Sequence, residues 1–126
     1  MNASNEDVTQ ATVETEAVMA PQSVPVNVYE TTAALVVVAP MAAVTPEDVR
    51  VELHPGDPAC VRFWAHVRSS GTREYLIREW EYGGYERQLD LPAGFGSGVE
   101  ASLKNGQLVI RLLRGEPVER LDVTPS

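Results

Sequence analysis

Residues 101–110 read Ala-Ser-Leu-Lys-Asn-Gly-Gln-Leu-Val-Ile, with apolar residues alternating on both sides of Asn105-Gly106. Asparagine and glycine both accept the positive φ of a type I′ turn. Asn-Gly between two alternating runs is therefore the strongest short-range signal for a β-hairpin. The stretch predicts two antiparallel strands that are joined at Asn105-Gly106.

The same period of two, or a short continuous apolar run, recurs on the N-terminal side of this hairpin. Turn-forming residues such as proline, glycine, aspartate and serine separate the runs, and no long amphipathic helix is present. About eight short strands in this arrangement predict an all-β, immunoglobulin-like antiparallel β-sandwich. The predicted strands are Val24–Tyr29, Leu35–Ala39, Val49–Leu53, Val61–Val67, Tyr75–Trp80, Leu89–Leu91, Val99–Leu103 and Leu108–Leu112.

The charge divides the chain of 126 residues, which is long enough for one ordinary domain, into three parts. Residues 1–23 hold four acidic residues, no basic residue and no aromatic residue, so we expect a flexible acidic N-terminal arm. Residues 24–115 hold 11 acidic and nine basic residues and form the predicted sandwich. Residues 116–126, with two prolines, read as a flexible C-terminal extension.

The composition excludes several classes of protein. A net charge of −8 argues against nucleic acid and against an anionic membrane surface as partners. The longest apolar stretch, Ala33–Val44, has 12 residues, whereas a membrane span needs about 20. The start of the sequence lacks the basic and apolar pattern of a signal peptide, so we expect a cytoplasmic protein.

The segments that could suggest a catalytic or ligand-binding site do not match the patterns that such sites require. The segment Gly94–Gly98 is glycine-rich, but no Lys-Ser/Thr follows it, so we interpret it as a flexible connection and not a phosphate loop. The evenly spaced His54, Cys60 and His66 need not converge on alternating strands. We expect no catalytic residue, no metal and no cofactor, and hence a binding module and not an enzyme. A redox role of Cys60 stays open.

Four pieces of the sequence, in this order and spacing, resemble the small heat-shock proteins, which are built on the α-crystallin domain. The hairpin resembles the family signature, in which alanine is followed by Asn/Asp-Gly and then leucine. Tyr85–Pro92 resembles the family's aromatic-x-Arg-x-Phe-x-Leu-Pro strand. Val24–Glu30 with Leu35–Ala39 resembles its opening strands, and Thr45–Val49 resembles its usual lead into the following strand.

The resemblance covers about residues 24–115 and is to the bacterial and plant type of the family. The sequence departs from the family pattern at four positions. Ala42 and Ala43 stand where the family often has Pro-Gly, Leu89 replaces the usual phenylalanine, and Gln107 replaces an apolar residue.

The resemblance implies a docking motif in the C-terminal extension. Leu121 and Val123 are similar to the family's Ile-x-Ile/Val motif, which docks onto a neighbouring subunit between two strands. An ordinary apolar pair in a tail is the alternative. The strands that match are Val49–Leu53 and Val99–Leu103, so the groove for tails or unfolded segments would be lined by Val49, Val51, Leu53, Ala101 and Leu103. The alternative for these five residues is ordinary core.

The resemblance also implies a homodimer, and possibly a larger oligomer. In bacterial and plant members, the strand that matches residues 74–82 crosses to the partner and pairs with the strand that matches Val24–Tyr29. The interface would then include Tyr75, Ile77 and Trp80 of the crossing strand, and Val26 and Val28 of the partner's strand with which it pairs. An internal hairpin is the alternative. Arg87 either bridges the subunits or forms a surface ion pair.

The function that the resemblance implies is that of an ATP-independent holdase chaperone. Such a protein binds partly unfolded, non-native client proteins and prevents their aggregation. The alternative is a β-sandwich adaptor or co-chaperone module that binds specific folded partners.

Overall fold

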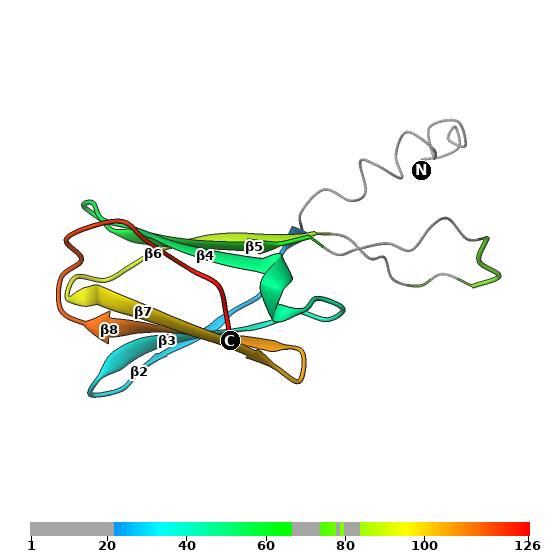
Figure 1. The fold of residues 1–126 in the computed structure, drawn as a ribbon, viewed down its shortest axis with the longest axis horizontal. Helices are drawn as coiled ribbons and strands as arrows, with labels where there is room; N and C mark the ends of the chain where they lie inside the picture. Colours follow the sequence, from blue (N-terminus) through cyan, green and yellow to red (C-terminus); the bar gives the residue numbers. More distant parts are fainter. Residues whose placement is uncertain (1–21, 67–73, 78, 80–83) are drawn as a thin grey trace.

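The computed structural model describes residues 22–66, 74–77, 79 and 84–126. These residues form two stacked sheets with strand orders β1-β6-β5-β4-β9 and β2-β3-β8-β7 (Figure 1). All pairings are antiparallel except that of β1 with β6. The strands are β1 (Gln22–Ser23), β2 (Asn27–Glu30), β3 (Ala34–Pro40), β4 (Val49–His54), β5 (Cys60–Ala65), β6 (Tyr85–Asp90), β7 (Phe95–Lys104), β8 (Gln107–Arg114) and β9 (Leu121–Val123). The predicted all-β sandwich is confirmed.

The hairpin predicted at Asn105-Gly106 joins β7 to β8. Both turn residues have positive φ, 53° for Asn105 and 74° for Gly106. Lys104 and Gln107 face each other directly across the turn. This geometry suits an Asn-Gly pair, because other L-residues are strained at positive φ.

The core lies between the two sheets and follows the period of two. In β4, Val49, Val51 and Leu53 are buried, whereas Arg50 between them is exposed. Alternate burial is what one solvated face and one packed face produce in an antiparallel sheet. The largest fully buried side chains are those of Phe63, Met41, Leu53, Leu108, Ile110, Leu112, Val24, Val37, Val49, Val51 and Val61.

The strand predicted at Tyr75–Trp80 is not formed in its described residues, 75–77 and 79, which belong to no strand. The structure differs from the sequence analysis at two further places. Gln22 and Ser23, which we assigned to the arm, form β1 beside Tyr85 and Glu86 of β6. Their pairing is parallel and distant in sequence, so it leaves no local pattern. Val24 follows them and is buried between β1 and β2, outside any strand.

The second difference corrects our interpretation of Gly94–Gly98 as a flexible connection. Residues 95–98 form the first part of β7, and Phe95 is 4 % exposed. A register shift between Phe95 and Val99 accommodates Gly96, whose φ is 122°. The glycines therefore mark an irregular strand, as glycines inside strands often do.

Helical structure in the described residues is limited to one 3-10 turn, η1 (Pro46–Asp48). In the described part of the chain, no helix is long and apolar enough to cross a membrane.

The turn after β3 contains a strained residue. Ala43 has a φ of 65°. An L-residue with a Cβ atom in this conformation is disfavoured by about 1–2 kcal/mol. Ala42 beside it is equally exposed and does not have a positive φ.

We therefore expect Ala43→Gly to stabilise the fold. The relief of strain exceeds the extra backbone entropy of glycine, so the free energy of unfolding should rise by about 0.5–1 kcal/mol in urea denaturation. The matched control Ala42→Gly has only the entropy cost of glycine and should lower the free energy of unfolding by about 0.5–1 kcal/mol. Equal destabilisation by both substitutions would contradict the strain at Ala43.

Candidate functional site

The candidate site is the region between β4, near one edge of the first sheet, and β7, at one edge of the second, and it is called the groove below. The C-terminal segment 116–126, called the tail below, runs from the end of β8 across this side of the sandwich to β7 (Figure 1). Within it, β9 pairs antiparallel with β4, so that Leu121 faces Leu53 and Val123 faces Val51. The tail thus adds a strand to a sheet edge, a common way to bind an extended segment.

The apolar residues predicted for the groove belong to the hydrophobic core or pack against it. Val49, Val51 and Leu53 are 0 % exposed and Leu103 is 8 % exposed when the tail is present. Ala101, Leu121 and Val123 are half-buried and pack against the same core. Val49, Val51, Leu53 and Leu103 are therefore core residues in this chain, and their role in binding tails or unfolded segments stays a prediction.

The structure places Leu121 and Val123 on β4 of the same chain. Our sequence analysis placed the motif on a neighbouring subunit, and docking between subunits stays a prediction. The pairing itself needs only an extended segment and an open strand edge, and a tail of the same chain satisfies both conditions.

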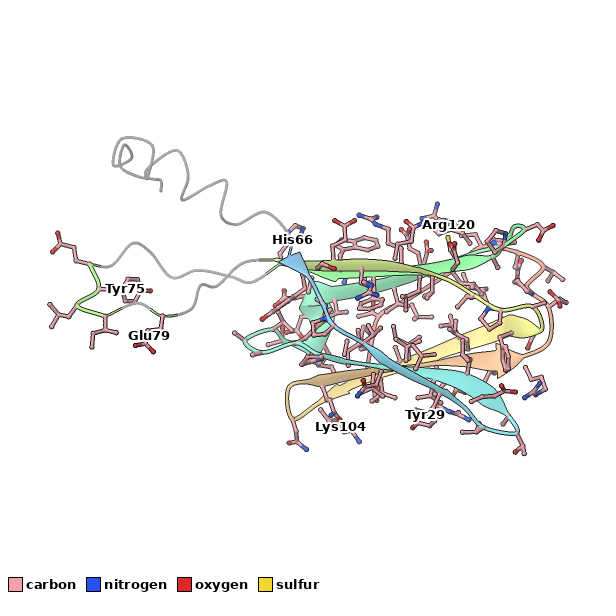
Figure 2. All side chains as sticks on the ribbon, turned by 180° about the vertical axis from the view of Figure 1, so that it is seen from behind. Tyr29, His66, Tyr75, Glu79, Lys104 and Arg120 are labelled. Atoms are coloured by element: carbon pink, nitrogen blue, oxygen red, sulfur yellow. The ribbon has the colours of Figure 1, made fainter. Side chains whose placement is uncertain are left out.

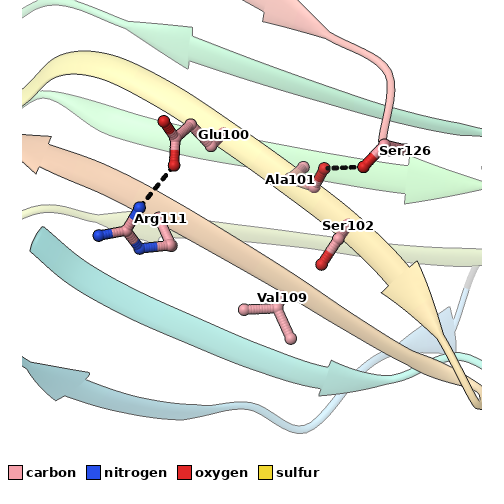
Figure 3. A pocket seen from close by; sticks show the side chains of 6 residues that line it. All are labelled: Glu100, Ala101, Ser102, Val109, Arg111 and Ser126. Atoms are coloured by element: carbon pink, nitrogen blue, oxygen red, sulfur yellow. Dashed lines mark hydrogen bonds and ion pairs between the residues drawn. The ribbon is translucent and has the colours of Figure 1, made fainter.

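The far end of the tail is attached to the opposite sheet. Ser126 donates its backbone N–H to the carbonyl oxygen of Ala101 and accepts a hydrogen bond from the N–H of Leu103, both at 3.1 Å. Figure 3 shows Ser126 beside Ala101 and Ser102 of β7. Pro125 is buried. The sequence analysis missed both residues, because a Pro-Ser pair after the motif has no periodic signal.

A charged cluster fastens β9 to β4 on the solvent side. The Arg120 guanidinium donates through Nη2 to Oε2 of Glu52 at 2.8 Å and through Nε to Oδ1 of Asp122 at 3.1 Å. The other carboxylate oxygen of Glu52 lies 2.9 Å from Nε2 of His54. Hydrogen bonding to Asp122, and then the charges of Asp122 and Glu52, raise the pKa of Arg120 above its ordinary value. The Arg120–Glu52 ion pair is called the latch below.

The sequence analysis did not find the latch. Glu52 and Arg120 are 68 positions apart, and only the register of β4 with β9 brings them together. Opposite charges on paired strands could have indicated it, but only after the pairing was known.

The residues predicted for a dimer interface lie in two places. Val26 is half-buried against the core, whereas Val28 is 47 % exposed on β2 at the edge of the second sheet. Tyr75 and Ile77 are exposed and belong to no strand of this chain. Tyr75 lies far from the sandwich (Figure 2). Trp80 lies outside the described residues.

Arg87 has a role within the chain that neither alternative included. Its Nη1 donates to the backbone carbonyl oxygen of Val24 at 2.7 Å. This bond attaches the segment between β1 and β2 to β6. A subunit bridge by the same guanidinium stays a prediction.

The evenly spaced His54, Cys60 and His66 do not converge. His54 faces Cys60 across β4 and β5, whereas His66 follows the opposite end of β5. Among the described residues, no group of three or more histidine, cysteine, aspartate or glutamate side chains is arranged to hold a metal ion.

The chain is a β-sandwich in which an extended tail strand pairs with β4, and the comparisons with known proteins agree with this fold. The model of the Hsp20/alpha crystallin family matches residues 27–124, so the chain belongs to this family of small heat shock proteins. No curated protein matches the sequence at a significant level.

Solved structures share the fold. The chain superposes on the hspA protein of Xanthomonas axonopodis with a TM-score of 0.63 and 21 % identity, covering 79 % of this chain and 100 % of that one. A small heat-shock protein of Xylella fastidiosa superposes with a TM-score of 0.60 and 21 % identity, covering 85 % of this chain and 94 % of that one. HSP18.5 of E. histolytica superposes with a TM-score of 0.59 and 15 % identity, covering 74 % of this chain and 88 % of that one. The bacterial and plant subtype stays a prediction.

We expect Arg120→Gln to loosen the tail without unfolding the sandwich. Loss of an exposed ion pair should speed amide hydrogen exchange at Leu121–Val123 by about two- to fivefold, as measured by NMR. Arg111→Gln is the matched control, because Arg111 forms an exposed ion pair with Glu100 on the second sheet. Unchanged exchange in Arg120→Gln, or equal acceleration in the control, would contradict a role of the latch in holding the tail.

Proposed function

We propose that the protein is an ATP-independent holdase chaperone, which binds partly unfolded proteins and prevents their aggregation. The observation that supports this most directly is the groove between β4 and β7. It holds an extended segment through three paired positions on β4 and two apolar side chains, Leu121 and Val123. Membership of the Hsp20/alpha crystallin family favours the same role.

This mode of binding suits unfolded clients. The hydrogen bonds of an added strand use backbone groups, which every polypeptide has, and so they demand little of the client sequence. The apolar floor of Val51, Leu53 and Leu103 favours segments with alternating apolar residues, which native proteins keep buried. Holding such segments lowers the concentration of free unfolded chains by mass action and requires no chemical step.

We further propose that the chain forms a homodimer through β2. This strand is the edge of the second sheet, its four residues are exposed, and Val28 and Tyr29 are 47 % and 54 % exposed. An edge strand with apolar side chains favours pairing with another strand. Leu76 and Ile77, at 103 % and 73 % exposure, provide apolar residues that a partner's edge would bury.

The division into residues 1–23, 24–115 and 116–126 is part of this proposal, with the strand at Gln22–Ser23 counted with the sandwich. The cytoplasmic location expected from the sequence stays a prediction.

A light-scattering assay of a heat-labile enzyme tests the holdase proposal. At an equimolar ratio, the full chain should reduce scattering at the unfolding temperature at least about twofold, because binding removes unfolded client from the aggregating pool. A chain of residues 22–126 should retain this activity, since the groove lies within it. Absence of suppression by both chains, at several client ratios, would overturn the proposal.

Substitution on the exposed segment tests the dimer. Ile77→Asp should weaken dimerisation about ten- to a hundredfold, because an interface would lose one buried isoleucine and gain a carboxylate. The molar mass by light scattering over a dilution series measures this, and Glu79→Gln on the same segment is the control. If the wild-type chain is monomeric and Leu121→Ala leaves its mass unchanged, the result would favour the alternative function, a β-sandwich adaptor that binds specific folded partners.

A further inference from the structure

The turn Asn105-Gly106 carries the chemistry of a modification site as well as that of a hairpin. Asn105 is the only asparagine of the chain that is followed by glycine, whereas the asparagines at positions 2, 5 and 27 are followed by alanine, glutamate and valine. Glycine has no side chain to hinder its backbone nitrogen, so the side chain of the preceding asparagine can approach that nitrogen closely. Asn105 is therefore the asparagine of this chain that reacts most readily with its own backbone.

The reaction in question is deamidation by ring closure. The backbone nitrogen of Gly106 gives up its proton to water or hydroxide and attacks Cγ of Asn105. A C–N bond forms, the side-chain amide takes up a proton and leaves as ammonia, and a five-membered succinimide ring remains. Water then opens the ring at one of its two carbonyl carbons, which gives aspartate or isoaspartate at position 105. Water is the only co-reactant.

The turn is open to the water that the reaction requires. Lys104, Asn105 and Gly106 are exposed, and a Cβ atom on Gly106 would meet no atom within 4 Å. Lys104, which is labelled in Figure 2, marks the end of the sandwich at which the turn lies. In the folded chain the reaction is therefore limited by the conformation of the turn and not by access of solvent.

The folded turn holds the reacting atoms apart. Positive φ at both residues, 53° for Asn105 and 74° for Gly106, is the signature of a type I′ turn. In such a turn ψ of the first residue is about 30°, which directs the nitrogen of Gly106 to the side of the backbone opposite the Cβ atom of Asn105. Closure of the five-membered ring needs both atoms on the same side, so ψ of Asn105 has to rotate through a large angle.

Two contacts oppose that rotation. Lys104 and Gln107 pair across the turn, as the last residue of β7 and the first residue of β8. The carbonyl oxygen of Gly106 accepts a hydrogen bond at 2.8 Å from the backbone N–H of Met41, which is 0 % exposed. The turn is thus attached both to its own strands and to a buried residue after β3. Rotation of ψ at Asn105 therefore requires the hairpin to open.

We propose that Asn105 is a site of spontaneous deamidation that the closed β7–β8 hairpin protects. The reaction proceeds in chains whose hairpin has opened, so the modified fraction records how long the hairpin has been open. The two products differ in their consequences. Aspartate keeps the turn, because Asp-Gly suits a type I′ turn as Asn-Gly does, whereas isoaspartate adds a methylene to the main chain and shifts Lys104 out of register with Gln107.

Isoaspartate would act on the centre of the second sheet. β8 pairs with β7 on one side and with β3 on the other, and Leu103 and Leu108, which face each other next to the turn, are both buried. The turn alone cannot absorb an extra main-chain atom while Gly106 stays bonded to Met41. A hairpin that carries isoaspartate should therefore open more readily than the original hairpin.

Peptide mapping of the full chain tests the protection. One sample would be kept folded at slightly alkaline pH, and a second would be kept at the same pH and temperature in urea at a concentration that unfolds the chain. Cleavage after Glu100 and Glu116 releases residues 101–116, and mass spectrometry of this peptide measures the deamidated fraction over time. Deamidation at Asn105 should be at least about tenfold slower in the folded chain, because it waits for the hairpin to open.

Asn27 is the matched control in the unfolded sample, because the branched side chain of Val28 hinders attack by the following nitrogen. In urea it should react at least about tenfold more slowly than Asn105. Equal rates at Asn105 in the folded and the unfolded chain would overturn the protection. A rate at Asn105 no higher than that at Asn27 in urea would overturn the assignment of the site. Neither result depends on client binding or on dimerisation.

The two products are compared after refolding. Chains that carry aspartate and chains that carry isoaspartate are separated by chromatography, and the variant Asn105→Asp supplies a reference sample of the first. Asn105→Asp should keep the urea midpoint of the unmodified chain, whereas the isoaspartate chain should unfold at a lower urea concentration. Equal midpoints for the two products would overturn the proposed shift of register.

Discussion

The apolar layer between the two sheets is the interaction on which the rest of the structure depends. Val51 and Phe63 of the first sheet and Ile110 of the second are 0 % exposed, and all three belong to this layer. Burying an aliphatic or aromatic side chain of this size contributes about 1.5–3 kcal/mol relative to leaving it exposed. A sandwich of only two sheets is open at its sides, however, and the layer remains accessible wherever an edge is not covered.

Because the apolar layer is accessible at uncovered edges, the way in which each sheet edge is covered matters for the proposed function. β1 covers the edge of β6, and the tail covers the side between β4 and β7. Among the described residues, β2 has no further strand beside it. The region covered by the tail and the exposed β2 share the same chemistry, an extended backbone edge with apolar side chains, and the proposed client binding and the proposed dimer both rest on it.

The elements that could be predicted from the sequence are those with a local signal. The Asn105-Gly106 turn, the alternation in β4 and β8, and the apolar pair Leu121 and Val123 were all visible without the structure. The elements that could not be predicted depend on contacts between distant residues. β1 is recognisable only beside β6, the early part of β7 only once Phe95 is seen in the core, and the Arg120–Glu52 pair only once β4 and β9 are in register.

The sequence by itself therefore determined that the chain alternates apolar and polar residues into strands, and that these strands form a two-layered sandwich. Alternation is a property of neighbouring residues, because side chains point to opposite faces of a strand with a period of two. Only the tertiary structure decided which strands became edges and that β9 pairs with β4. Those outcomes depend on contacts between residues far apart in the sequence, such as the pairing of Val51 with Val123, which leave no pattern among neighbouring residues.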